Sequence, residues 1–190
     1  MDSLKDLFEE TLKDVYFAEN AILKALPKME GKASSSELKQ AFSDHLRETQ
    51  TQVKRLDEVF KLIGMRPEGK ECPALKGLVQ ETEELMSNAR NAEVMDAGLI
   101  GCAQAVEHYE IARYGTLIAW AEQLQLGDDA IELLEETLEE EEATDEKLTE
   151  IAMGGIDQQA ERSDDDDDDN DRGRRYAGSD KDDDKEEDDR

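Results

Sequence analysis

Residues 106–117 read VEHYEIARYGTL, and this stretch decides the fold. Apolar and small side chains recur in it at intervals of three and four residues, as they do on one face of an α-helix. The same stretch carries Glu107 and Glu110 on or beside that face. The pattern extends in both directions and predicts a helix from about Ala92 to Gln123, followed by a break at Gly127.

This stretch has a partner near the N-terminus, VYFAENAILKAL at residues 15–26. The identical pairs in this alignment include Val15 with Val106, Glu19 with Glu110, and Leu26 with Leu117. HLRETQTQVKRL at residues 45–56 aligns in the same way with TLEEEEATDEKL at residues 137–148. The two alignments predict two helical hairpins related by pseudo-twofold symmetry.

The rest of the chain supplies the boundaries of these helices. The first helix starts at Leu4, after a cap at Ser3 or Asp2, and its apolar pattern runs to Leu26. The other expected elements are a helix from the serine cluster 34–36 to Gly64, a short crossover helix after the loop 66–73, and a last helix from Ile131 to the pair Gly154–Gly155. No segment alternates with period two, so we predict an all-α protein, a four-helix bundle with a short crossover helix.

Charge is the most unusual bulk property of the sequence. The chain has 51 Asp and Glu residues against 23 Lys and Arg residues, a formal net charge of −28. Nucleic acid is excluded as a partner, because phosphate binding needs clustered cations. The acidic N-terminus is unlike a signal peptide, and no run of apolar residues is long enough for a membrane span, so we expect a cytoplasmic protein with no membrane association.

The C-terminal part differs in composition from the rest. From Ser163 onward, 15 acids and 6 bases occur with almost no apolar residues. Such a segment cannot bury enough surface to offset the entropy of ordering. We therefore predict a bundle domain at residues 1–160 and a disordered acidic tail at residues 161–190. Cys72 and Cys102 have no CxxC partner, which gives no support to a disulfide framework or a thiolate metal site.

Each long helix of the predicted bundle places ionisable side chains on or beside its inner face. At 100° per residue these positions are Glu19, His45, Glu48, Glu107, Glu110, Glu141 and Asp145. Burying unpaired carboxylates costs several kcal/mol, so such groups are neutralised, paired with cations or bound to a metal. Few Lys or Arg residues share these faces. Converging carboxylates and an imidazole suit iron or manganese, and carboxylates can bridge two ions.

A structural interpretation competes with the metal site. In so acidic a sequence some acids fall on inner faces by chance, above all in the run from Glu139 to Glu142. A single His45 on an apolar face is more often a hydrogen-bonded core residue than a ligand, and His108 lies off the inner face. Tyr16, Tyr109 and Tyr114 can hydrogen-bond to core carboxylates or line helix interfaces.

Four blocks of the sequence resemble the YciF/YciE-like branch of the ferritin-like superfamily, over roughly residues 3 to 153. They read LFEETLKDVYFAEN, AFSDHLRETQTQVKRL, VEHYEIARYGTL and LLEETLEEEEATDEKL. The resemblance implies a ferritin-like four-helix bundle, a homodimer and a stress-associated role. Rubrerythrins, more distant relatives, have one Glu on the first helix and a Glu pair on the third, which Glu19, Glu107 and Glu110 match. Their ExxH motifs are absent, because the second helix has the reversed order His45-x-x-Glu48 and the fourth has no histidine.

Two functions follow as hypotheses. The first is a metal-binding stress protein with a dinuclear iron or manganese centre that reacts with peroxide or dioxygen. Because the chain has no rubredoxin-like module, its electron donor would be external. The second is a non-catalytic, dimeric helical-bundle protein without bound metal, which acts through partner binding during stress. A ferritin-type storage cage is less expected, since no further helix for cage assembly is evident.

Overall fold

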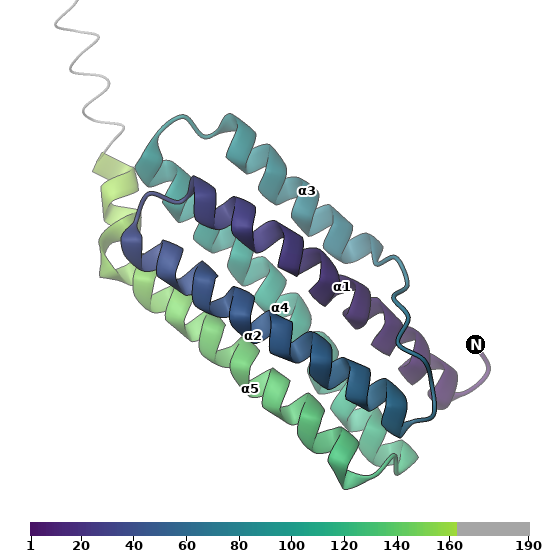
Figure 1. The fold of residues 1–190 in the computed structure, drawn as a ribbon. Coiled ribbons are helices and arrows are strands. Elements are labelled where there is room, and N and C mark those ends of the chain that lie inside the picture. Colours follow the sequence, from purple (N-terminus) through teal and green to yellow (C-terminus); the bar gives the residue numbers. More distant parts are fainter. Residues whose placement is uncertain (163–190) are drawn as a thin grey trace, which may run out of the picture.

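The computed structural model describes residues 1–162, and the predicted disordered tail lies almost entirely outside these residues. The elements are α1 (Leu4–Lys32), α2 (Ser36–Leu62), α3 (Pro73–Asn88), α4 (Ala92–Leu124), α5 (Asp128–Ile151) and the π-helical turn η1 (Ala152–Ile156) (Figure 1). The described part of the chain contains no strand. The prediction of an all-α fold is therefore confirmed.

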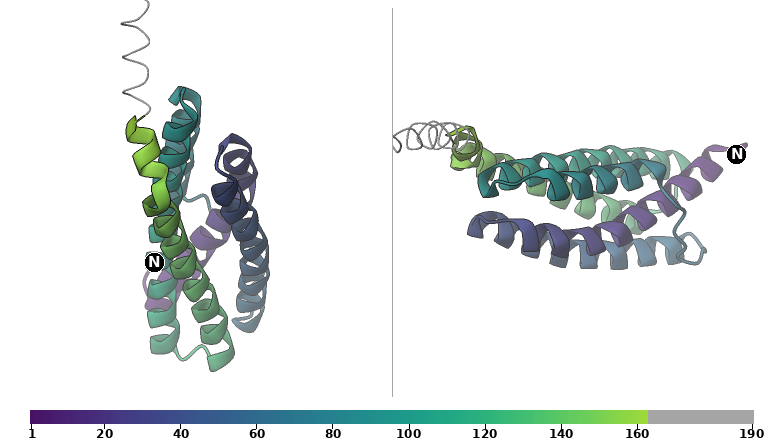
Figure 2. Two further views of the ribbon diagram at one scale, coloured as in Figure 1. Left: turned by 90° about the vertical axis from the view of Figure 1, so that its left-hand side faces the viewer. Right: turned by 90° about the horizontal axis from the view of Figure 1, so that it is seen from above.

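The four long helices form a bundle in which every neighbour is antiparallel. Hairpins α1–α2 and α4–α5 lie side by side, with α2 packed on α5 and α1 packed on α4 (Figures 1 and 2). The crossover helix α3 contacts α4 and α1 on the outside of the bundle. It runs along the bundle rather than across it, and so returns the chain to the end where α4 starts. Within residues 1–162, no helix is long and apolar enough to cross a membrane.

Serine residues start the first two helices. The backbone N–H of Asp6 donates to Ser3 Oγ at 3.1 Å and the N–H of Ser3 donates to Asp6 Oδ2 at 3.2 Å, a capping box that confirms the expected cap. At the turn into α2, the buried carboxylate of Asp96 accepts from the backbone N–H groups of Ser34 at 2.7 Å and Ser35 at 2.8 Å. This contact joins the α1–α2 turn to α4 and fixes the relative position of the two hairpins.

Two helix ends differ from the prediction. Helix α1 continues past Leu26 to Lys32 with Pro27 inside it, because Met29 is buried and keeps the apolar face in contact with the core. The last helix was predicted to end at the pair Gly154–Gly155, and α5 ends slightly earlier, at Ile151. The chain continues through η1, where Gly155 has a φ of 131°, and is helical again over residues 157–162. Glycine accepts this angle without steric strain, so Gly155 forms a kink between the two helical segments.

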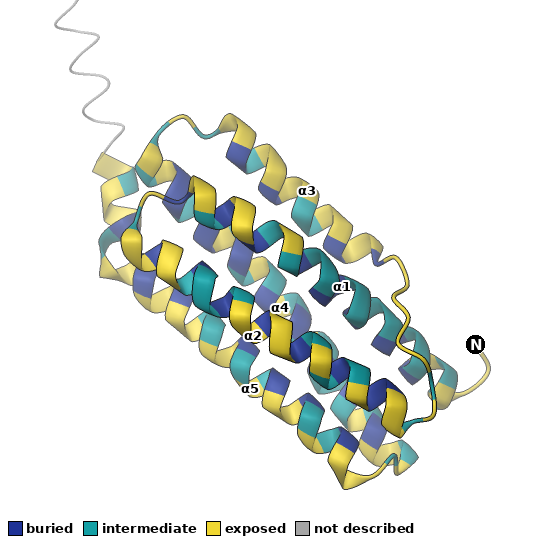
Figure 3. Ribbon diagram, viewed as in Figure 1, coloured by how far each residue is buried: buried dark blue, intermediate teal, exposed yellow. Residues whose placement is uncertain are grey.

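The core consists of two apolar clusters separated by a polar layer. Figure 3 shows the buried residues distributed along the whole length of the long helices. One cluster, which includes Phe42 and Leu148, lies toward the α1–α2 turn, and the other, which includes Phe8 and Leu56, lies toward the α4–α5 turn. The buried polar residues between them come from all four long helices: Glu19, His45, Thr49, Gln52, Glu107, Glu110, Thr137 and Glu141. A polar layer at the middle of a bundle needs an explanation, because apolar side chains there would be more favourable.

Candidate metal centre

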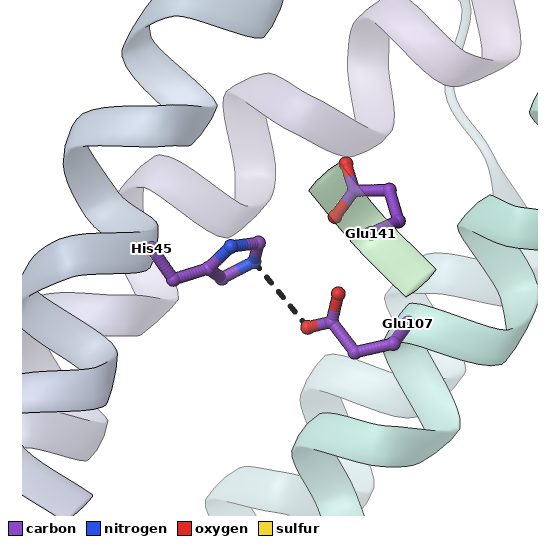
Figure 4. A group of neighbouring side chains, drawn as sticks. All are labelled: His45, Glu107 and Glu141. Atoms are coloured by element: carbon purple, nitrogen blue, oxygen red, sulfur yellow. Dashed lines mark ion pairs between the residues drawn. The ribbon is translucent and has the colours of Figure 1, made fainter. Parts of the chain in front are cut away.

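Five ionisable side chains meet in this polar layer. Glu19 comes from α1, His45 from α2, Glu107 and Glu110 from α4, and Glu141 from α5. None is more than 4% exposed. The one-turn spacing of the α4 pair places both of its carboxylates inward, and the other three project toward them from the surrounding helices. Figure 4 shows three of the five, with His45 directed at Glu107 and Glu141 beside them.

These side chains form two overlapping groups. One ligand atom from each of His45, Glu107 and Glu141 lies within 4.8 Å of the others, and the same holds for Glu19, Glu110 and Glu141. His45 Nε2 and Glu107 Oε1 are 3.3 Å apart (Figure 4). Glu141 belongs to both groups, so its carboxylate lies between two places that each offer three donor atoms.

Most polar atoms of the cluster have no hydrogen-bond partner among the described residues. They are Glu19 Oε2, both nitrogens of His45, Glu107 Oε2, and both carboxylate oxygens of Glu110 and of Glu141. Folded proteins pair nearly all such buried atoms, since an unpaired one costs about 1 to 3 kcal/mol or more when charged. The unpaired atoms belong almost entirely to oxygen donors, with one imidazole. This donor set fits iron or manganese and does not fit a thiolate-selecting metal.

Burial and mutual repulsion change the protonation of the cluster. Burial, opposed by the Tyr114 hydrogen bond, raises the pKa of Glu19 to about 7. Burial together with the neighbouring carboxylates raises the pKa of Glu110 and of Glu141 well above the ordinary range. For His45, burial lowers the pKa, but the facing carboxylates of Glu107 and Glu141 outweigh it and the net pKa is raised. A bound cation would offset the repulsion that causes these shifts.

Neighbouring side chains hold the cluster in place. The hydroxyl of Tyr114, fully buried, donates to Glu19 Oε1 at 2.5 Å. This hydrogen bond to a core carboxylate is one of the two roles that the sequence left open for the tyrosines. The sequence contains one indication of this role. Tyr114 follows Glu110 by one helical turn, so both side chains lie on the inner face of the same helix. Arg55 binds Glu140 through two nitrogens at 2.6 and 2.7 Å, which neutralises the acid next to Glu141.

Two of the seven residues predicted from the sequence lie outside this cluster. Glu48 is exposed in the middle of α2, with its Oε2 atom 3.7 Å from His45 Nδ1. Asp145 lies between α4 and α5, where Gln104 Nε2 donates to its Oδ1 at 3.2 Å and the exposed His108 approaches its Oδ2 at 3.4 Å. The structure therefore brings together Glu19, His45, Glu107, Glu110 and Glu141, and leaves Glu48 at the rim.

Fold and site together define the class of protein: an all-α, ferritin-like four-helix bundle with a buried cluster of carboxylates and one histidine. The family described as a domain of unknown function, DUF892, matches residues 3–161. Protein YciF of Escherichia coli (strain K12) is 44% identical over 162 residues, which are 85% of this chain and 97% of that protein. The chain belongs to this YciF-like family.

Solved structures agree with the fold. The crystal structure of the stress protein YciF of E. coli matches with a TM-score of 0.79 at 44% identity, over 83% of this chain and 99% of that chain. YcfI from Rhodopseudomonas palustris matches with a TM-score of 0.76 at 49% identity, over 78% of this chain and 94% of that chain. A protein from Xanthomonas campestris with 21% identity and a TM-score of 0.65 supports the fold alone, over 85% of this chain and 99% of that chain.

Proposed function

We propose that this protein is a YciF-like metalloprotein that holds two ions of iron or manganese between its four long helices. One observation carries the proposal: Glu141 is shared by two groups of buried donors, and neither of its oxygens has a good hydrogen bond among residues 1–162. Two cations placed on either side of this carboxylate would neutralise the buried carboxylates of the cluster. A carboxylate shared in this way is a common bridge in dinuclear sites of helical bundles.

The two positions would differ in chemistry. His45, Glu107 and Glu141 would hold one ion with a nitrogen and oxygen donors, and Glu19, Glu110 and Glu141 would hold the other with oxygen donors only. The cause is a break in the internal symmetry. The residue that corresponds to His45 in the second hairpin is Thr137, which offers no nitrogen donor, and the residue that corresponds to Glu141 in the first hairpin is Thr49, whose hydroxyl donates to the backbone carbonyl of His45 at 2.8 Å. We expect the nitrogen-containing position to bind first, because imidazole favours transition metals.

The reaction that this site suits best is the reduction of peroxide or dioxygen. Bound iron would supply the electrons, and an external donor would have to restore them. The chain's own residues would position the site: Tyr114 fixes one oxygen of Glu19, and the apolar clusters on either side limit the access of water. The description of E. coli YciF as a stress protein is consistent with such a reaction.

A non-catalytic, dimeric bundle protein is the second candidate. A specific observation favours it: with its pKa raised to about 7, Glu19 can be uncharged near neutral pH, which would reduce the repulsion in the cluster without a metal. Under this alternative the buried acids would serve only to specify the arrangement of the four helices, and the protein would act by binding partners.

Metal titration separates the two candidates. Protein stripped with a chelator and free of any affinity tag is titrated anaerobically with Fe²⁺ or Mn²⁺, beside an E110Q/E141Q variant and a control, E135Q/E142Q, in which two exposed acids of α5 are changed. We expect two tightly bound ions in the wild type and in the control, and their loss in E110Q/E141Q. Equal binding by all three proteins would show that the ions bind to acids on the surface, and it would overturn the proposal of a buried site. Peroxide consumption by the iron-loaded wild type then tests the reaction.

A further inference from the structure

A cavity of about 700 Å³ opens to the surface between α2 and α5. Two members of the buried cluster, His45 and Glu107, line it, whereas Glu19 and Glu110 do not. The walls include the apolar side chains of Phe42 and Leu148. We call this cavity the α2–α5 groove. It connects the solvent to the nitrogen-containing half of the cluster and not to the other half.

The mouth of the groove is acidic. Its carboxylates come from both helices: Glu37, Asp44 and Glu48 from α2, and Glu136, Glu139 and Glu140 from α5. Two cations also line it, and both already pair with acids. Arg55 contacts Glu136 at 3.0 Å and Glu140 at 2.6 Å, and Lys147 contacts Glu37 at 3.4 Å. The groove thus keeps an excess of negative charge, which raises the local concentration of cations and repels anions.

The floor of the groove offers donors that need a partner. His45, only 4% exposed, and Glu107, 2% exposed, both line it. Both nitrogens of His45 and Oε2 of Glu107 have no hydrogen bond within residues 1–162. Glu48 connects the mouth to this floor, since the residue is exposed while its Oε2 atom lies 3.7 Å from His45 Nδ1. A cation moving inward would meet carboxylate oxygens first and the imidazole last.

We propose that the α2–α5 groove is the route by which divalent cations reach the cluster, with Glu48 transferring them from the mouth to His45 and Glu107. This inference rests on the metal site proposed above. It gives Glu48 the role of a positioning residue on the path. It also sets an order, because an ion bound for Glu19 and Glu110 must first pass the position of His45 and Glu107.

A steric block tests the route. Ala143 lines the groove on α5 and is exposed, so A143F would fill the mouth without changing a ligand or a charge. A119F is the matched control, an exposed alanine of α4 that does not line the groove. Anaerobic uptake of Co²⁺ is followed by stopped-flow absorption, and the final content is measured after desalting. We expect roughly tenfold slower uptake in A143F, unchanged final content, and no change in A119F.

A second pair of variants keeps the test decisive if A143F does not fold. E48Q/E139Q removes two charges from the groove, and E135Q/E142Q removes two from the exposed side of the same bundle. Uptake should slow in E48Q/E139Q alone, and its dependence on salt should become shallower. Wild-type rates in both A143F and E48Q/E139Q would overturn the route while leaving the metal site intact. Failure of the wild type to bind Co²⁺ at all would overturn the metal site and the route with it.

Discussion

His45 Nε2 lies 3.3 Å from Glu107 Oε1, so a side chain of α2 reaches the diagonally opposite helix α4 through the centre of the bundle. This pair is a direct contact between the two hairpins inside the polar layer. Burial disfavours the charged form of His45, but the facing carboxylates of Glu107 and Glu141 outweigh this effect and raise the pKa of the imidazole. Packing alone would favour an apolar side chain at this place. The His45–Glu107 contact therefore supports the proposed metal position that includes a nitrogen donor.

Replacement of His45 tests that position. We expect H45Q to lower the affinity for the first Fe²⁺ or Mn²⁺ ion roughly 10- to 100-fold, because it removes the only imidazole of the cluster. The all-oxygen position of Glu19 and Glu110 should still bind. H108Q is the control, since the His108 side chain is 70% exposed and outside the cluster. Equal titration curves for wild type and H45Q would contradict the assignment.

The pH dependence of stability tests the repulsion among the buried acids. The pKa of Glu19 is raised from 4.5 to about 7, mainly by burial. A raised folded-state pKa stabilises the protein at pH values below 4.5, and this contribution is lost as pH rises through about 7. The metal-free protein should therefore lose on the order of 3 kcal/mol from this group between pH 5 and 8.

Urea unfolding of metal-free wild type and E19Q across that pH range measures this loss. E19Q has no group to ionise, so its stability relative to wild type should increase with pH. Adding Mn²⁺ at a free concentration a hundredfold above Kd should stabilise the wild type by about 2.7 kcal/mol for each occupied position. E19Q, which keeps the nitrogen-containing position, should gain only the contribution of that position. A difference between wild type and E19Q that is constant with pH would show that Glu19 titrates normally.

Removal of the Tyr114 hydroxyl tests the support of the all-oxygen position. In Y114F, Glu19 loses its 2.5 Å hydrogen bond, so its pKa should rise further and its position should vary more. We expect the second ion to bind about tenfold more weakly, with a stability loss of about 1 to 2 kcal/mol. Y16F is the control, because the Tyr16 ring packs edge-on against Phe60 with the centroids 5.5 Å apart and its hydroxyl interacts with Asp57 and Asn20. Unchanged binding of the second ion in Y114F would contradict the proposal that the Tyr114 hydroxyl supports the all-oxygen position.

The sequence predicted the long helices and the inward direction of Glu19, Glu107 and Glu110, because apolar residues on both sides of each acid define the buried face. It also selected Glu141 from the acids of residues 139–142, but it did not show how the neighbouring acids are paired. In the structure, Arg55 of another helix pairs with Glu140, and Glu141 is buried. A helical wheel places a residue on a face but does not say which neighbour that face contacts.

The two predicted site residues outside the cluster have the same explanation. Glu48 and Asp145 lie at the borders of their inner faces, where a small rotation of the helix decides between core and solvent. Asp145 turns toward Gln104 and His108 of α4, and Glu48 turns toward the mouth of the groove. The run of α1 through Pro27 depends likewise on tertiary packing, since the buried Met29 outweighs the lost backbone hydrogen bond.

Anomalous diffraction at the iron edge, from crystals of the protein loaded anaerobically with Fe²⁺, tests the central claim most directly. The account predicts two peaks roughly 3.5 to 4 Å apart, one on each side of Glu141, with His45 and Glu107 on one ion and Glu19 and Glu110 on the other. Well-ordered crystals with no peak in the polar layer, or with iron only on the surface acids, would contradict it.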